Sequence, residues 1–436
     1  MAAYFLQSQT NAPIQITLFD AAERVGGKVV TCRFTQKQIA YEAGAAEFYD
    51  YSATGADPLK ELITDDLNLP IRQIGGSAVL MDQKLLANLD DFREHFGEAA
   101  YQALLDFDRI GKDWMSPREY YSSDNTWESG IVTPSSSFDG HLARMAPPET
   151  RRFIERLIHS DLATEPKRTS FAYGLQNYLM NDPRYLRQYR IEGGNQRFPE
   201  ELARRIDATW RLQHRVTSIG RNETGKLQIS AQQGNASSAQ EFDFVVVALP
   251  GNYLPKVEFR GEKLAAAMRE HHLHYDHPAH YLRISILFER PFWREKLEDS
   301  YFMLDAFGGC CLYDETPIES KAGVLGWLLA GDAAQELSEL EDPKLISLAI
   351  ESLPAVLHAG RESFLEGHVH RWIGAVNAMP GGTSPRGLDR RHQPEPQEHS
   401  DFFVVGDYMF DSTINGLLDS AEYVADWIAA EITSRQ

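Results

Sequence analysis

The 436-residue sequence contains little cysteine, no long apolar run and no excess of positive charge. Its three cysteines are Cys32, Cys310 and Cys311, and none belongs to a CxxC pair. This spacing argues against a disulfide framework and a cysteine zinc site, and it favours a reducing compartment. The first residues lack the features of a signal peptide, and the longest apolar runs, 244–249 and 324–330, are too short to span a bilayer. We therefore expect a cytoplasmic protein without a membrane anchor.

The charge balance excludes a second group of functions. The formal net charge is -20 at pH 7, and no long basic run offsets it. Nucleic acid phosphates and anionic lipids repel such a chain, so neither is expected as a partner. The sequence also lacks the G-x-S-x-G turn of many hydrolases and a Walker loop for nucleoside triphosphates. A small-molecule substrate remains the expected partner, and self-association into a homo-oligomer stays open.

What the sequence does contain is a series of strand and helix signals typical of an α/β protein. Three segments have the composition of buried strands: 14–19, 242–249 and 402–405. Apolar residues recur at helical spacing in four others: 58–69, 92–114, 148–162 and the C-terminal stretch from about Asn415. With 43% apolar residues the chain can bury a large core, and its length favours two domains.

The first of these strands leads into a turn with the chemistry of a nucleotide site. Asp20 stands at the end of the strand, where a carboxylate can accept hydrogen bonds from a ribose diol. A solvated Asp at a strand end is the alternative. Gly26 and Gly27 then allow the backbone to approach a ligand, and the Lys28 cation can meet phosphate. The combination favours the nucleotide interpretation.

At this point the sequence resembles a known family. Residues 20–28, DAAERVGGK, are similar to the acid and glycine-pair motif of the flavin-containing amine oxidases, although that family usually has Arg in place of Lys28. Residues 42–45, EAGA, resemble the family's turn next to the flavin. Residues 402–407, FFVVGD, and 412–416, STING, resemble the strand, acid and helix start that close its FAD site. The N-terminus of such a helix stabilises the negative charge of a reduced flavin.

The resemblance implies an α/β fold with a discontinuous, Rossmann-like FAD-binding domain formed by residues 1–50, 191–255 and 400–436. An α+β substrate-binding domain would comprise residues 51–190 and 256–399. Val216 matches a residue whose backbone meets adenine, and Trp372 matches an aromatic residue ahead of the last FAD segment. The residues that the resemblance assigns to FAD are Asp20, Gly26, Gly27, Lys28, Gly44, Ala45, Val216, Trp372, Gly406, Asp407, Asn415, Gly416 and Leu417.

The implied activity is that of an FAD-dependent oxidoreductase, which moves a hydride from a small amine or amino-acid-like substrate to flavin N5. Arg283 stands where many family members have a lysine, and Leu417 replaces a tyrosine. Because Arg cannot serve as a tunable base, we expect Arg283 to bind a substrate carboxylate or to stabilise the flavin, with His280 as a candidate base beside it. A desaturase or dehydrogenase of a non-amine substrate is the first alternative.

The family's first strand and GxGxxG loop have no counterpart in this sequence. Residues 2–6 already have the composition of the helix that follows that loop. We expect an upstream segment to supply both, and a non-catalytic truncated family member is the second alternative. The histidines at 271, 272, 274, 277 and 280 lack the spacing of a metal site, so no metal is expected.

Overall fold

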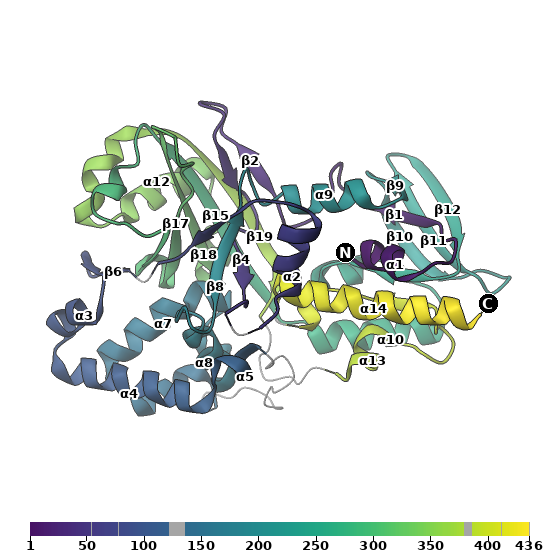
Figure 1. Cartoon of the computed structure of the whole chain (residues 1–436), viewed down its shortest axis with the longest axis horizontal. Helices are drawn as coiled ribbons and strands as arrows, with labels where there is room; N and C mark the ends of the chain where they lie inside the picture. Colours follow the sequence, from purple (N-terminus) through teal and green to yellow (C-terminus); the bar gives the residue numbers. More distant parts are fainter. Residues whose placement is uncertain (54, 77, 122–135, 379–385, 411, 436) are drawn as a thin grey trace.

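The computed structural model describes residues 1–436 apart from 54, 77, 122–135, 379–385, 411 and 436. Figure 1 shows two lobes side by side. One lobe is built around a large sheet flanked by helices. The other holds the C-terminal helix α14 (Ile414–Ser434), the N-terminal helix α1 (Ala2–Gln9) and several small sheets. Segments far apart in the sequence therefore meet within one lobe.

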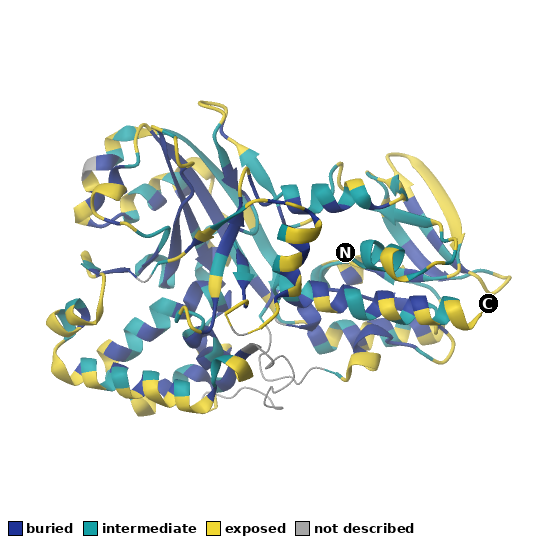
Figure 2. Cartoon of the chain, viewed as in Figure 1, coloured by how far each residue is buried: buried dark blue, intermediate teal, exposed yellow. Residues whose placement is uncertain are grey.

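The large sheet organises the first lobe. Its strands lie in the order β19 (Phe364–Asn377), β15 (Pro278–Phe288), β18 (Gly323–Ala330), β17 (Cys310–Asp314), β16 (Tyr301–Leu304), β6 (Val79–Met81) and β7 (Lys84–Leu86). Neighbouring strands are antiparallel except for the parallel pair β6 and β16. Figure 2 shows the central strands of this sheet as mostly buried. Burial on both faces explains their near-continuous apolar sequences.

Strand β15 presents different residues to its two faces. Leu282 and Ile284 belong to an apolar core that contains Trp327. Leu287, on the other face, packs against the N-terminal residues Phe34, Tyr41 and Ala43. Because side chains alternate along a strand, Arg283 lies on the same face as Leu287. Strand β15 thus links the large sheet to the N-terminal segment.

Helices cover a further side of this lobe (Figure 1). They are α3 (Leu89–Phe96), α4 (Glu98–Trp114), α5 (Pro117–Tyr121), α6 (Phe138–Met145), α7 (Pro148–Leu162) and α8 (Phe171–Leu179). The predicted helical segment 92–114 forms two helices, because Gly97 takes a φ of 85° at the junction. The predicted helix start at Pro58 is confirmed in α2 (Pro58–Glu61), where Asp57 accepts a hydrogen bond from Lys60 N at 3.0 Å.

Two pairs of parallel strands organise the second lobe. They are β1 (Ile16–Phe19) with β9 (Ala208–Arg211), and β13 (Val245–Val247) with β20 (Phe402–Val404). No ladder joins the two pairs within the described residues. Helix α14 packs Val424 and Ile428 against Phe403 and Val405, and α1 lies beside α14. The strands predicted near 14–19 and 402–405 and both terminal helices are confirmed.

The second lobe also contains a small sheet and the helix that follows it. Strands β12 (Ala236–Phe242), β11 (Leu227–Gln233), β10 (Arg215–Arg221) and β14 (Glu258–Phe259) form the sheet, and α10 (Glu262–Tyr275) follows it. Leu264 and Met268 of α10 share a core with Val245 and Phe402. Residues of α10, which we expected in a substrate-binding domain, therefore pack against the parallel strand pairs.

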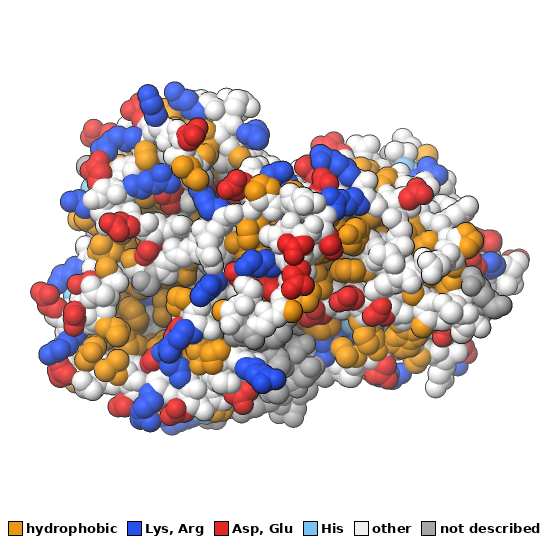
Figure 3. Space-filling view, in the orientation of Figure 1, with side chains coloured by type: hydrophobic (Ala, Val, Ile, Leu, Met, Phe, Trp, Pro, Cys, Tyr) orange, Lys and Arg blue, Asp and Glu red, His pale blue; other side chains and the backbone are white. Residues whose placement is uncertain are grey.

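Two short sheets lie between the lobes in Figure 1. One pairs β2 (Thr31–Arg33) with β3 (Ala40–Glu42), and the other has the order β4 (Phe48–Asp50), β8 (Arg187–Ile191), β5 (Ile71–Ile74). On the face shown in Figure 3, acidic and basic side chains are interspersed, and no extended basic patch is visible. Along the described chain, no helix combines the length and the apolar character needed to cross a bilayer.

Replacement of Gly174 by Ala is expected to destabilise the protein. A Cβ at Gly174 in α8 would lie 2.3 Å from carbons of the buried Phe138 ring. Ala ordinarily stabilises a helix interior by about 1 kcal/mol relative to Gly, but this overlap reverses the sign. We expect the free energy of unfolding, measured in urea, to fall by about 1–3 kcal/mol. Gly75→Ala, whose Cβ would meet nothing within 4 Å, is the control. An equal loss in both variants would contradict the packing argument.

Candidate active site

Asp20 and the glycine pair lie just beyond the carboxyl end of β1. Asp20 Oδ1 accepts a hydrogen bond from Ala22 N at 2.8 Å, so the turn orients the carboxylate. Gly26 and Gly27 adopt φ values of 102° and 52°, which favour glycine. A Cβ on Gly27 would meet nothing within 4 Å. The backbone at this turn is therefore open to a ligand.

The segment that carries Gly44 passes directly beside Lys28. A Cβ on Gly44 would lie 1.9 Å from the Lys28 carbonyl oxygen, so only glycine fits. Ala45 N donates a hydrogen bond to the same oxygen at 3.1 Å. Trp372 of β19 donates from Nε1 to the Ala43 carbonyl at 2.7 Å. The structure thus brings together residues that the sequence places in three separate motifs.

An ion pair joins the N-terminal motif to the C-terminal one. Lys28 Nζ pairs with Asp407 and also donates to the Ala375 carbonyl at 3.1 Å. The two charged side chains are 29% and 15% exposed, so water still reaches them. A Cβ on the preceding Gly406 would lie 2.5 Å from the Tyr408 ring. Asp407 is held at the carboxyl end of β20, beside the lysine from the turn after β1.

The N-terminus of α14 forms the next part of the site. The Thr413 hydroxyl accepts a hydrogen bond from Gly416 N at 3.1 Å and caps the helix. Asn415, Gly416 and Leu417 belong to its first turn, where the Leu417 N–H donates to the Thr413 carbonyl at 3.1 Å and the helix dipole gives this end a positive character. Val216 lies elsewhere in the second lobe, at a bulge of β10.

A cavity of ≈ 80 Å³ adjoins this helix end, with Ser412 and Thr413 in its wall. One water needs roughly 10–15 Å³ of such space, so the cavity can hold a small molecule. Among the described residues, its remaining wall is rich in tyrosine and contains one acid: Tyr49, Tyr51, Tyr120, Tyr173, Tyr281 and Asp161. A second cavity of ≈ 20 Å³ shares Val376 and Asn377 with the first and includes Asp407 in its wall. The candidate cofactor residues and the tyrosine-lined space are therefore neighbours.

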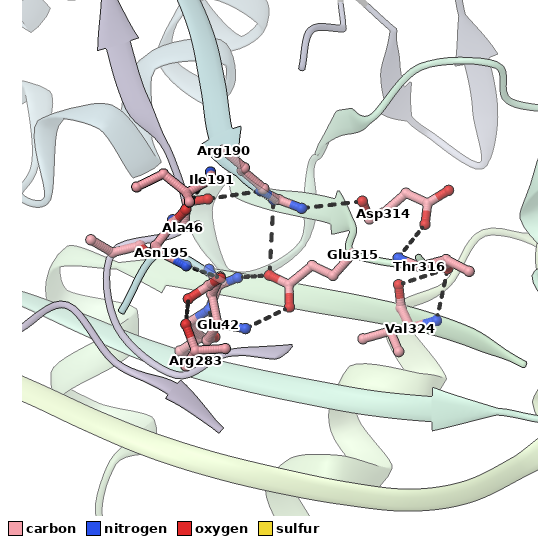
Figure 4. A network of polar contacts seen from close by, with 12 residues as sticks. Glu42, Ala46, Arg190, Ile191, Asn195, Arg283, Asp314, Glu315, Thr316 and Val324 are labelled. Carbon is pink, nitrogen blue, oxygen red and sulfur yellow. Dashed lines mark hydrogen bonds and ion pairs between the residues drawn. The ribbon is translucent and has the colours of Figure 1, made fainter. Parts of the chain in front are cut away.

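Arg283 lies in a buried network of charged groups (Figure 4). It pairs with Glu315 and donates from Nε to the Glu42 carbonyl at 2.5 Å. Arg190 of β8 lies 3.9 Å from the same Glu315 carboxylate and donates to the Ala46 carbonyl at 2.7 Å. The network therefore joins β15, the end of β17, β8 and the segment after β3.

Glu42 closes this network on the side of the cofactor motifs. Its N–H donates to Glu315 at 3.0 Å, and its carboxylate accepts hydrogen bonds from Asn195 N at 2.9 Å and from the Thr31 hydroxyl at 2.8 Å. Burial, with the Glu315 charge added, raises the pKa of Glu42 to about 7. Two residues after Glu42 comes Gly44, so the charged network also fixes the turn beside Lys28.

The structure does not bring His280 and Arg283 together. His280 Nδ1 accepts a hydrogen bond from Gly374 N at 3.0 Å. Burial lowers the pKa of His280, and the charged groups that act on it are Arg168 and Asp332, outside the Arg283 network. The two side chains therefore do not form the pair that we expected from the sequence.

Sequence reasoning missed Asp161, Glu47, Arg190 and Glu315. Arg190 and Glu315 gave no local signal, because each meets partners far away along the chain. Asp161, in contrast, did have a local sequence signal. It lies in the last turn of α7, where the helix dipole favours cations, so an acid there is unfavourable unless it has another use.

Comparison with known proteins agrees with this arrangement. The family model described as flavin containing amine oxidoreductase matches residues 1–429. Cyclohexylamine oxidase from Brevibacterium oxydans IH-35A has a similar structure, with a TM-score of 0.71 and 15% sequence identity over 99% of this chain and 96% of that one. A wild-type putrescine oxidase bound to putrescine has a TM-score of 0.70 and 17% identity, again over 99% and 96%. No curated protein sequence matches the chain.

The chain therefore belongs to the flavin-containing amine oxidoreductases. It is an FAD-dependent oxidoreductase with the α/β fold of that family. The residues present fit the cofactor. Asp20 and Asp407 both follow parallel strands at their carboxyl ends, where nucleotide cofactors bind. The open backbone at Gly27, the Lys28 cation and the N-terminus of α14 are groups that could hold the phosphates and the flavin ring of FAD.

Replacement of Glu315 by Gln is expected to destabilise the fold strongly. The change leaves Arg283 and Arg190 buried without their shared carboxylate. Losing one partner of a buried ion pair costs about 3–5 kcal/mol, measurable as the free energy of unfolding. The control is Glu295→Gln, which breaks an exposed ion pair with Arg290 and should cost about 0–1 kcal/mol. Similar losses in the two variants would refute the structural importance of the network.

A second prediction concerns acid stability. His271 of α10 is fully buried, with Nε2 2.9 Å from the Tyr408 hydroxyl. No group of metal ligands forms around it or elsewhere in the described residues. Burial, with the Arg386 charge added, lowers the pKa of His271 to about 3. The folded state therefore holds the neutral imidazole, whereas the unfolded chain binds a proton below about pH 6.5. The free energy of unfolding consequently decreases as the pH falls from about 6.5 towards 3.

Between pH 6.5 and 4.5, we expect the free energy of unfolding of His271→Gln to decrease by about 2 kcal/mol less than that of the wild type. Urea unfolding across this pH range measures the difference. The matched control is His214→Gln, since His214 is half-buried in the turn after β9. If the two variants show the same dependence on pH as the wild type, His271 is not a source of acid sensitivity.

Proposed function

We propose that the chain oxidises a small amine at the cavity beside the N-terminus of α14. The observation that carries the proposal is the position of this cavity. One part of its wall is the helix end that stabilises a reduced flavin, and another part is a cluster of tyrosines. Membership of the flavin-containing amine oxidoreductases supports it. The names of the two structural relatives, a cyclohexylamine oxidase and a putrescine oxidase, agree with it.

The proposed FAD-binding unit comprises residues 1–50, 191–255 and 400–436, to which the packing of β14 and α10 adds residues 256–275. In this unit Asp20 would accept hydrogen bonds from the ribose, Lys28 would neutralise phosphate charge, and Asp407 would bind the flavin side chain. The first turn of α14, with Asn415, Gly416 and Leu417, would direct the positive end of the helix dipole towards the flavin ring. The remaining residues, 51–190 and 276–399, would bind the substrate.

When bound, FAD supplies the oxidant that takes a hydride from the carbon beside the amine nitrogen. The chain's own residues bind and orient the amine. Tyr49, Tyr173 and Tyr281 present ring surfaces that exclude water from the alkyl part of the substrate. Because a protonated amine has no free electron pair, the reacting nitrogen must be neutral. Apolar ring surfaces favour that neutral form.

The buried network argues against an amino-acid substrate. Arg283 was a candidate to bind a substrate carboxylate, but it pairs with Glu315 and does not line the cavity. A desaturase or dehydrogenase of a non-amine substrate remains the second candidate, because an arginine in this network replaces the usual lysine. We also propose a cytoplasmic location. Support comes from Cys32, Cys310 and Cys311, which are free thiols in the structure.

Anaerobic mixing of the FAD-loaded full chain with a primary alkylamine tests the function. We expect the visible absorbance of the oxidised flavin to disappear, and oxygen or an artificial acceptor to restore it. Amino acids of equal chain length should react much more slowly. If no amine bleaches a flavin that the chain retains, amine oxidation is excluded and the non-amine candidate takes its place.

The cofactor assignment is tested in the same samples. Asp407→Asn should weaken FAD binding roughly 10-fold or more, since it removes a charged hydrogen-bonding group. Asp389→Asn, an exposed acid in the short helix α13 (Leu388–His392), should leave FAD binding unchanged. Equal FAD binding by both variants would rule out the proposed contact between Asp407 and the cofactor.

A further inference from the structure

Strand β19 is irregular where its end approaches the cofactor motifs. The register with β15 jumps between Ile373 and Val376, so Gly374 and Ala375 are two extra residues that form a bulge on β19. Gly374 takes a φ of 65°, in the left-handed region that favours glycine. Bulges beside active sites bend a strand and redirect the groups that follow. The bulge therefore decides how the end of β19 meets the second lobe.

Hydrogen bonds connect this end of β19 to both halves of the cofactor motifs. Within the bulge, the Ala375 carbonyl accepts a hydrogen bond from Lys28 Nζ at 3.1 Å. Beyond the bulge, Asn377 Nδ2 donates to the Tyr408 carbonyl at 3.0 Å. The Asn377 carbonyl accepts from the Ser412 hydroxyl at 2.8 Å. A strand of the large sheet thus holds the turn after β1 and the connection between β20 and α14.

Asn377 is the residue at which the substrate side and the cofactor side meet. It is only 7% exposed and lies in the wall of both cavities. Little water competes for its amide, and a buried carbonyl that loses its donor stays unsatisfied. The hydrogen bond from Asn377 to Tyr408 is therefore a firm attachment of β19 to the connection between β20 and α14.

The same connection contains a strained residue just before α14. Ser412 adopts a φ of 59°, which residues other than glycine seldom adopt. Its N–H donates to the Asp407 carbonyl at 3.1 Å, and its hydroxyl donates to Asn377. The next residue, Thr413, caps α14 by accepting from Gly416 N. Strained conformations persist where several contacts determine them, so the start of α14 depends on the contacts of Ser412.

The position of this helix start matters for the redox chemistry. The positive end of α14 would stabilise the negative charge that a reduced flavin carries, and the effect falls off within one turn. The ring of an oxidised flavin is neutral and would gain much less. A displaced helix start would therefore weaken the binding of reduced flavin more than that of oxidised flavin, and the reduction potential would fall.

We propose that Asn377 is a positioning residue for the flavin, which holds the start of α14 in place through the Tyr408 carbonyl and the Ser412 hydroxyl. The proposal rests on the assignment of the N-terminus of α14 to the flavin ring, and it holds for any substrate. Asn377 acts through the connection between β20 and α14 and needs no contact of its own with FAD. A strand of the proposed substrate-binding unit thereby tunes the cofactor.

The reduction potential of the bound flavin tests the proposal without any substrate. The FAD-loaded full chain is reduced slowly in the presence of a dye of known potential. In Asn377→Ala we expect the affinity for reduced flavin relative to oxidised flavin to fall about tenfold, which lowers the two-electron potential by about 30 mV. Asn177→Ala is the matched control and should leave the potential unchanged. Asn177 is a similarly buried asparagine of the first cavity, and its Nδ2 donates to the Tyr173 carbonyl at 2.8 Å.

Ser412→Gly is a milder variant that keeps the test decisive if Asn377→Ala folds poorly. Glycine adopts the φ of Ser412 without strain, so the change removes only the hydroxyl that donates to Asn377. We expect the same ratio of affinities to fall about threefold, or about 15 mV, with FAD retained. Because both residues act on one connection, the double variant should shift the potential by less than the sum of the single shifts.

Anaerobic reduction by an alkylamine separates positioning of the flavin from binding of the substrate. Asn377→Ala should lower the rate constant of flavin reduction at saturating amine about threefold or more, with the Kd of the amine changed by less than about twofold. Asn177→Ala should show the reverse, a weaker Kd and an unchanged rate constant.

The outcomes also separate this inference from the proposed function. Wild-type potentials in both Asn377→Ala and Ser412→Gly, with FAD bound, would overturn the positioning role. An equal fall of the potential in Asn177→Ala would show a general loosening of the cavity wall, and the proposal would again be wrong. If the potential falls as expected and no amine reduces the flavin, the positioning role stands and amine oxidation fails.

Discussion

The buried ion pair between Arg283 and Glu315 is the interaction on which the geometry of the site depends. Arg283 belongs to β15, which lies between β19 and β18 in the large sheet, and Glu315 follows β17 in the same sheet. Arg190 from β8 shares the carboxylate, and Glu42 binds both members through its backbone. Buried charges tolerate little displacement, because separation leaves each of them desolvated and unpaired. The network therefore fixes the N-terminal segment against the large sheet.

The network contacts both parts of the candidate active site, the cofactor motifs and the tyrosine-lined cavity. On one side, Glu42 lies two residues before Gly44, whose close approach to Lys28 places the lysine next to Asp407. On the other side, the charges of Arg283 and Arg190 act on Glu47, and Glu47 acts on Asp161. The arginine that replaces the usual lysine is thus part of the framework around the cavity.

Much of the fold was predictable where local pattern and tertiary environment agree. Strand 14–19 and the C-terminal helix have strong sequence patterns, and each is present. The 14-residue strand β19 was not predicted, because its half-buried sequence mixes histidine, arginine and glycine with apolar residues. Its pairing with the whole of β15 stabilises it. The apolar stretch 242–249 yields a strand of only three residues, since its single partner, β20, is equally short.

The sequence by itself determined the family and the cofactor, since these depend on short motifs in which glycine, acid and helix start are adjacent along the chain. Only the tertiary structure decided which charges meet. The separation of His280 from Arg283, the sharing of Glu315 by two arginines and the placement of Asp161 in a tyrosine-lined cavity all depend on contacts between distant segments. Burial sets the cost and the protonation of a charged group, and burial is a property of the packed chain.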